Sequence, residues 1–168
     1  GTDMAYAIDN LTNTGAQKAE TVVNGGKVIS EYRAIRQFAN STTGENILTI
    51  NGGEVSYVWM QSANAYANLA ATHVEGGTVE QIRISGNNAV LDLDVKASCL
   101  GENGVWGTMP TGKVLKEVEG YYTLVDAIAK IVAADNTTTY YASSATVLDN
   151  GDLEFTGKAW ANHDGLNT

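Results

Sequence analysis

The chain has 168 residues, of which 43% are apolar and 17% are charged, and its formal net charge is −9. This length fits one domain of about 100–200 residues, and the negative charge argues against nucleic acid as a partner. No stretch approaches the roughly 20 apolar residues that membrane insertion by a transmembrane segment requires. Cys99 is the only cysteine, which excludes an internal disulfide and predicts a small buried side chain.

The first half of the chain is predicted to contain helices and one hairpin. Residues 1–14 carry little pattern and are expected to form an N-terminal arm. A short helix is expected over residues 14–23, and apolar residues at three- and four-residue spacing predict helices over 27–39 and 62–74. Residues 47–60 contain two β-branched runs around Asn51-Gly52-Gly53, which is a strong hairpin signal.

The clearest pattern in the chain lies between residues 79 and 96. Apolar and polar residues alternate on both sides of Gly86-Asn87-Asn88, so each half has one apolar and one polar face. Because Gly and Asn tolerate the backbone conformations of tight turns, we predict an antiparallel hairpin. Four of its apolar side chains are expected to be buried, namely Ile82, Ile84, Leu91 and Leu93.

The second half of the chain is predicted to hold a long loop, a helix and a last hairpin. Glycines and the single proline mark residues 99–120 as irregular. Thr123 is a suitable N-cap for a helix over residues 123–134. A hairpin is expected over residues 138–160, turning at Asp149-Asn150-Gly151-Asp152, and residues 161–168 are expected to form a polar tail.

These elements together predict an α+β fold, with an antiparallel sheet built from about three β-hairpins and helices packed mainly on one face. Residues 15–160 are expected to form the single domain between the N-terminal arm and the C-terminal tail. The glycine pairs at 25–26, 52–53 and 76–77 are interpreted as turn and cap residues. We see no residue-level repeat behind the recurring hairpins.

Few residues suggest a chemical site. Asp92 and Asp94 share one face of a predicted strand and are candidate ligands for a hard cation, although a solvated outer face explains them as well. His73 and His163 have no partner at a metal-ligand spacing. No catalytic set is recognisable, so we expect neither an enzyme nor a cofactor.

The composition favours a structural or interaction protein, one repeated subunit of a larger assembly such as a virion component or an extracellular filament. The expected partners are therefore copies of the chain itself or other subunits. Candidate interface residues are Trp106, Met109, Tyr6 and Leu11. The alternative is a small-molecule or carbohydrate-binding α+β domain, possibly a cone-shaped enzyme, with a pocket lined by Tyr57, Trp59 and Tyr66.

Overall fold

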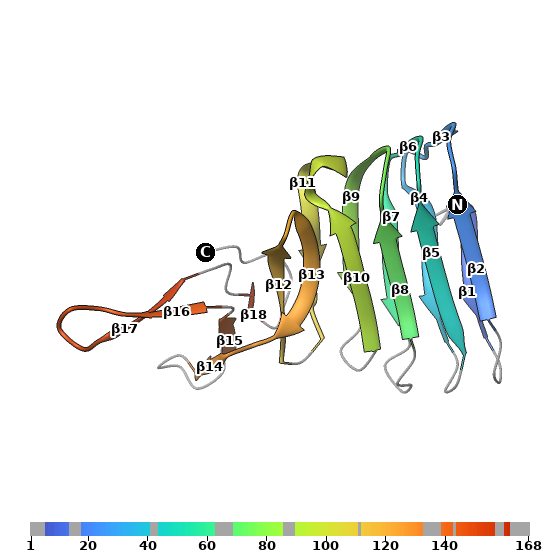
Figure 1. Cartoon of the computed structure of the whole chain (residues 1–168). Helices are drawn as coiled ribbons and strands as arrows, with labels where there is room; N and C mark the ends of the chain where they lie inside the picture. The colour runs from blue at the N-terminus through green and yellow to red at the C-terminus, as the bar shows by residue number, and fades with distance from the viewer. Residues whose placement is uncertain are drawn as a thin grey trace.

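The protein is built almost entirely from β-strands that stack into a solenoid (Figure 1). The computed structural model describes residues 6–13, 18–40, 44–62, 69–85, 90–110, 112–132, 139–142, 144–156 and 160–161. Within these ranges the only helical element is one 3₁₀ turn, Ala97–Cys99. The predicted α+β fold with helices on one face of a sheet is therefore wrong.

One long wall of the solenoid, sheet A, consists of parallel strands in the order β1-β4-β7-β9-β11. Two short strands, β3 and β6, extend this wall because β6 pairs with the first residues of β9. The strands of sheet A are β1 (Tyr6–Thr12), β3 (Lys27–Val28), β4 (Arg33–Ala39), β6 (Glu54–Val55), β7 (Val58–Ser62), β9 (Thr78–Ser85) and β11 (Leu100–Gly107).

The opposite wall, sheet B, has the order β2-β5-β8-β10-β13-β12. Its first four strands are parallel, whereas β13 pairs antiparallel with both β10 and β12. The strands of sheet B are β2 (Lys18–Val23), β5 (Glu45–Ile50), β8 (Leu69–Val74), β10 (Val90–Lys96), β12 (Lys113–Val118) and β13 (Tyr121–Asp126). The chain thus alternates between the two walls as it advances from β1 toward β11 (Figure 1).

Three equivalent corners carry the chain from sheet B to sheet A, at Asn24-Gly25-Gly26, Asn51-Gly52-Gly53 and Glu75-Gly76-Gly77. The corners stack through backbone hydrogen bonds, as the N–H of Glu54 donates to the carbonyl of Gly26 and that of Thr78 to Gly53, both at 2.9 Å. Asn51 Nδ2 also donates to Asn24 Oδ1 at 2.9 Å, across 27 residues. The glycine pairs therefore recur once in each of these coils of the solenoid. Our interpretation that the chain has no residue-level repeat is wrong.

Two of the predicted hairpins are corrected by this topology. Residues 47–60 and 79–96 do supply strands, but β5 and β10 belong to sheet B, whereas β7 and β9 belong to sheet A. The two strands of each predicted hairpin are instead successive parts of the coil and lie on opposite walls. The strands pair with neighbouring coils in parallel, because a chain that returns to the same wall after each coil runs in the same direction.

The segments predicted as helices also form strands. β4 shows why, because Ile35, Gln37 and Ala39 all point inward and are fully buried, but the polar Gln37 obscures the period of two. β8 contains two alanines, which have high helix propensity, yet Ala70, Thr72 and Val74 line the core. Stacking between coils supplies the hydrogen bonds and burial that override these local preferences. The helices predicted over residues 14–23 and 123–134 likewise give way to strands, namely β2 and β13.

The solenoid interior is filled by side chains. Sheet A contributes a row of Ile35, Val58 and Ile82, and sheet B contributes Leu48 and Leu93, all with no exposed surface. The predicted burial of Ile82, Ile84, Leu93 and Cys99 is confirmed. The side chain of Leu91 lies outside the described part of the structure.

A buried polar network joins the two walls within this core. Gln37 Nε2 donates to the carbonyl oxygens of Asn46 and Ala71, and Gln37 Oε1 accepts from Thr72 Oγ1. Asn46 and Asn10 exchange further hydrogen bonds, with Asn10 Nδ2 donating to Asn46 Oδ1 at 3.1 Å. These bonds satisfy polar groups that would otherwise make burial costly, and they link β1 and β4 of sheet A with β5 and β8 of sheet B.

Beyond β13 the chain forms small antiparallel ladders. β14 (Ala129–Val132) pairs with β15 (Thr139–Ala142), which also pairs with β18 (Trp160–Ala161). β16 (Ser144–Val147) and β17 (Leu153–Thr156) form a hairpin that projects away from the solenoid (Figure 1). The hairpin predicted within residues 138–160 is confirmed for β16 and β17, which turn through Asp149 to Asp152.

Two further predictions concern the chain as a whole. Of the arm expected over residues 1–14, the part from Tyr6 to Thr12 is strand β1 of sheet A. Of the loop expected over residues 99–120, large parts are strands β11 and β12. Across the described ranges we find no helix with the length and apolar character needed to cross a bilayer.

Candidate functional sites

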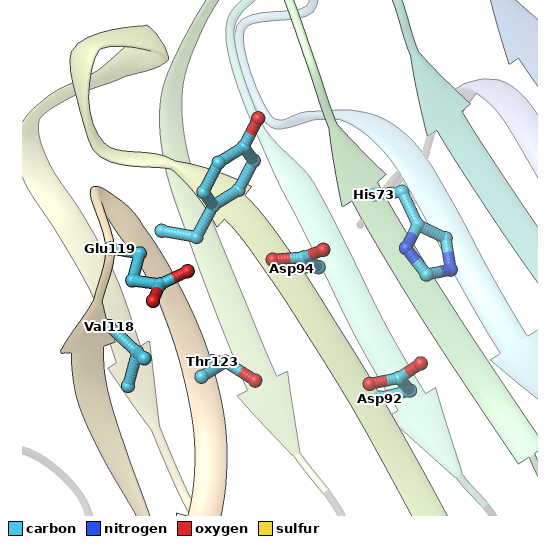
Figure 2. A pocket seen from close by; sticks show the side chains of 7 residues that line it. His73, Asp92, Asp94, Val118, Glu119 and Thr123 are labelled. Atoms are coloured by element: carbon cyan, nitrogen blue, oxygen red, sulfur yellow. The ribbon is translucent and has the colours of Figure 1, made fainter.

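A shallow depression of about 350 Å³ lies on the outer face of sheet B (Figure 2). It spans β8, β10 and β13 and includes the turn between β12 and β13. Figure 2 shows that its carboxylates, from Asp92, Asp94 and Glu119, stand apart from one another around the depression. The lining residues are His73, Asp92, Asp94, Val118, Glu119, Tyr121 and Thr123.

The period of two and the strand register position these side chains. Asp94 lies between His73 of β8 and Thr123 of β13 in the ladder, and Asp92 lies one step along the same face of β10. Both aspartates project outward, whereas Leu93 between them is buried. In the described part of the chain, no group of three or more His, Cys, Asp or Glu residues is arranged to hold a metal ion. Asp92 and Asp94 therefore form an open acidic surface.

One hydrogen bond ties the rim of this depression to a solenoid corner. The Tyr121 hydroxyl donates to Glu75 Oε2 at 2.9 Å. This hydrogen bond raises the pKa of Tyr121 above its ordinary value, because the neutral phenol can donate to the carboxylate and the phenolate cannot. The bond therefore favours the protonated phenol of this partly exposed side chain.

The outer face of sheet A has a different chemical character. Five residues in register on successive coils form a row across its parallel strands, in the order Asp9, Arg36, Trp59, Arg83 and Trp106. Arg33 lies over the same row, with its Cζ atom 3.7 Å from the centre of the Trp59 ring. The residues Arg33, Arg36, Trp59, Arg83 and Trp106 are called the arginine–tryptophan face below. It contains every arginine of the chain.

Stacking and hydrogen bonds hold the rings of this face in place. Arg83 lies over the Trp106 ring at 4.9 Å, and the indole N–H of Trp106 donates to Gln81 Oε1 at 3.1 Å. The indole N–H of Trp59 donates to Ser85 Oγ at 2.8 Å. A guanidinium over an aromatic ring contributes roughly 0.5–2 kcal/mol, so each such pair also strengthens the contact between coils.

The three arginines differ in how their charges are balanced. Arg36 binds Asp9 through two nitrogens, Nε to Oδ1 at 2.8 Å and Nη2 to Oδ2 at 2.5 Å, and this hydrogen bonding raises the pKa of Arg36 above its ordinary value. Arg33 is only 8% exposed, and its Nε and Nη1 have no hydrogen-bond acceptor among the described residues. Arg83 Nε is likewise buried without an acceptor there. The face thus carries two guanidinium groups that no carboxylate in the described chain neutralises through an ion pair.

The structure separates the residues predicted for a pocket and an interface. Tyr57 packs against Trp106 and Trp59 against Tyr6, each with ring centres 6.3 Å apart, so these rings lie on or beside sheet A. Met109 is buried within the chain, whereas Leu11 is exposed at β1. Two predicted residues, Tyr66 and His163, lie outside the described ranges.

Sequence reasoning missed the arginine–tryptophan face because its members are far apart in the chain. The available signal was the spacing of the glycine pairs, which reports the length of each coil. Once the coils are aligned on those corners, Trp59 and Arg83 both fall six residues after the second glycine, whereas Arg36 falls ten residues after it because the first coil is longer before β4. No protein-family model, curated protein or solved structure matches the chain.

Proposed function

We propose that this chain is a structural or interaction protein, one repeated subunit of a larger assembly such as a virion component or an extracellular filament. The solid interior supports this proposal, because aliphatic side chains and the buried amide network fill the space between the two walls. A rod with a packed core is suited to a structural subunit, because it can keep its shape while other subunits bind along its length. The observation that carries the proposal is the incomplete covering of the first coil.

The first coil leaves part of the core uncovered. Ile8 of β1 and Thr21 of β2 face inward but remain half-buried. Their register partners on the next coil, Ile35 and Leu48, have no exposed surface. Removing the remaining surface of such side chains from water favours association at roughly 25 cal/mol per Å² of apolar area.

The same coil presents backbone groups for strand pairing. The carbonyl of Thr12 accepts from Asn40, and that of Val23 accepts from Asn51, so these residues point toward the second coil. Since alternate residues of a strand direct their backbone groups to opposite sides, Leu11 and Val22 point away from the second coil. Among the described strands, β1 and β2 end sheets A and B on this side, which makes both of them templates for a strand from another subunit.

The test replaces Leu11 and Val22 with proline in the full-length chain. Proline removes the outward N–H groups without removing a hydrogen bond to β4 or β5, so the solenoid should stay folded. We expect the wild-type chain to self-associate with rising concentration in sedimentation velocity, and the proline double variant to associate at least tenfold more weakly. A matched double variant with alanine at both positions keeps the N–H groups and should associate much more strongly than the proline variant.

A wild-type chain that stays monomeric at every concentration would contradict self-assembly. Equal loss of association in the alanine and proline variants would show that the outer side chains, and not the strand edges, hold the contact. Deletion of the expected arm, residues 1–14, would be a poorer test, because it also removes β1 and the buried Asn10.

A further inference from the structure

We infer that the arginine–tryptophan face binds a linear anionic polysaccharide that bears carboxylate groups. This inference is independent of the assembly proposal, because it uses the outer face of sheet A and not the edges of β1 and β2. Three features carry it: Arg33 and Arg83 have no ion-pair partner among the described residues, the distance between them is regular, and aromatic rings accompany both of them.

The environment of Arg33 is the strongest single observation for this inference. Its guanidinium lies between the rings of Trp59 and Tyr32, 3.7 and 4.3 Å from their centres, while Nε and Nη1 have no acceptor in the described chain. A buried donor without an acceptor costs free energy, so the site is incomplete as it stands. Tyr32 is 47% exposed as a residue, and movement of its ring would open these two N–H groups to a carboxylate. A guanidinium binds a carboxylate through two parallel hydrogen bonds.

The spacing of the unneutralised charges fits a regular polymer. Arg33 lies over Trp59 of β7, and Arg83 lies over Trp106 of β11. These two strands flank β9, so the stacked pairs are separated by two strand spacings, roughly 9.6 Å. Two linked hexose rings extend over a comparable length. Carboxylates on every second sugar of an extended chain would therefore meet Arg33 and Arg83 in turn.

The rings on this face suit sugars. Aromatic side chains offer flat apolar surfaces with polar groups at the edge, and both Tyr32 and Trp106 retain exposed surface. Below this face, β4, β7 and β9 each pair with a strand on both sides, whereas β11 pairs only with β9 among the described strands. A polypeptide lying across β4, β7 and β9 would leave its own amides without partners, whereas sugar hydroxyls stay hydrated.

The charge of the whole chain distinguishes a polysaccharide from a nucleic acid. The face carries three arginines and Asp9, but the chain as a whole carries −9. A single-stranded nucleic acid brings one negative charge with every nucleotide and would be repelled by the surrounding acidic surface. A polymer with one carboxylate for every second sugar carries fewer charges over the same length and needs only the few cations that this face provides.

The first experiment uses half-esterified polygalacturonate oligomers, in which every second sugar on average keeps a free carboxylate. Their binding to the full chain is measured by calorimetry and by tryptophan fluorescence at low ionic strength. We expect binding that weakens with added salt, because the charges involved are screened. Fully methyl-esterified oligomers of the same length have the same sugar backbone without the charge and should not bind. Polyglutamate and oligothymidylate serve as the peptide and nucleic-acid comparisons.

Variants then assign the binding to this face. Arg83→Gln and Arg33→Gln should each weaken binding roughly 10- to 100-fold, the range for loss of a hydrogen bond to a charged group. Lys96→Gln removes one positive charge from β10 of sheet B and is the matched control, with unchanged affinity expected. Asp9→Asn should tighten binding, because it frees Arg36 from its ion pair. If the Asp9–Arg36 ion pair only stabilised the fold, Asp9→Asn would weaken binding instead.

The inference is overturned by absence of polygalacturonate binding at low salt, by equal binding of the esterified oligomers, or by equal weakening in Lys96→Gln. Tighter binding of oligothymidylate or polyglutamate would also overturn it and would assign the face to that class of ligand. Arg83 is only half-buried, so its variant keeps the test decisive if Arg33→Gln fails to fold. Circular dichroism of each variant provides that check.

Discussion

Leu93 is a residue whose environment could be predicted from its neighbours alone. It lies between Asp92 and Asp94 on β10, and the alternation of one apolar and two acidic residues directs it to the core, where it has no exposed surface. The same alternation places the two aspartates outward. The pattern therefore identified inward and outward residues correctly, even though the strand pairs with partners that were not expected.

Replacing Leu93 with alanine should lower the free energy of unfolding by about 2–5 kcal/mol, because the cavity left between the walls cannot collapse fully. Urea denaturation of the full chain measures this change. Asp92→Ala, on the exposed side of the same strand, is the control and should change stability by no more than about 0.5 kcal/mol. Equal effects of the two substitutions would contradict the assigned faces of β10.

Tyr121 shows how a single hydrogen bond makes stability depend on pH. Its pKa is raised by the bond to Glu75, so the folded state favours the protonated phenol more than the unfolded state does. The contribution of Tyr121 to stability is therefore fully present below the ordinary tyrosine pKa of about 10. It is lost as the pH rises through the raised pKa of the folded state.

The difference in unfolding free energy between wild type and Tyr121→Phe should accordingly stay constant near neutral pH and shrink in alkaline solution. Ultraviolet titration of phenolate, taken as a difference between the two proteins, should place the Tyr121 transition above that of the average tyrosine. In Glu75→Gln the transition should move down. A Tyr121 that ionises with or before the other tyrosines would contradict the hydrogen bond.

At the scale of elements, the corner between the two walls is the feature that defines the fold. A Cβ atom added to Gly76 would collide with the backbone oxygen of Asn51 on the preceding corner. Gly25 occupies the equivalent place on the first corner, where an added Cβ has nothing within 4 Å. The two glycines have the same role in the turn but differ in whether a coil is stacked against them.

Gly76→Ala should therefore destabilise the protein by about 1–3 kcal/mol, the range for a side chain forced into a packed site. Gly25→Ala should be neutral or slightly stabilising, since it only restricts the unfolded chain. Thermal unfolding of the two variants checks the difference between them. Destabilisation of equal size would mean that the corners do not stack closely.

The predicted helices failed at this same scale. Residues 69–74 contain alanines, and residues 33–39 have a buried glutamine, so neither segment shows the clean alternation of an isolated strand. In the folded protein Gln37 finds partners on β5 and β8, which makes its burial acceptable. Those partners belong to the opposite wall and were not visible in the local pattern. A hairpin such as β16 and β17 was predicted correctly because its partners are adjacent in the chain.

At the scale of the whole molecule, the solenoid gives two surfaces with different chemistry. The outer face of sheet B gathers Asp92, Asp94 and Glu119, whereas the outer face of sheet A gathers the arginines. Stacking in register produces this separation, because each coil adds one residue to a row that all coils share. Assembly through the first coil would lengthen both surfaces together, and a polysaccharide on sheet A would then meet repeated sites.

The sequence by itself determined the strands with strong alternation, the burial of their apolar faces, the last hairpin and the outward direction of Asp92 and Asp94. These features depend on contacts within a few residues or on the period of two, which a single chain displays directly. Only the tertiary structure decided that β9 and β10 lie on opposite walls, that the glycine pairs are stacked corners, and that Arg33, Trp59 and Arg83 meet. Parallel pairing joins residues more than 20 positions apart through backbone groups that every residue carries, so no local pattern of side chains records it.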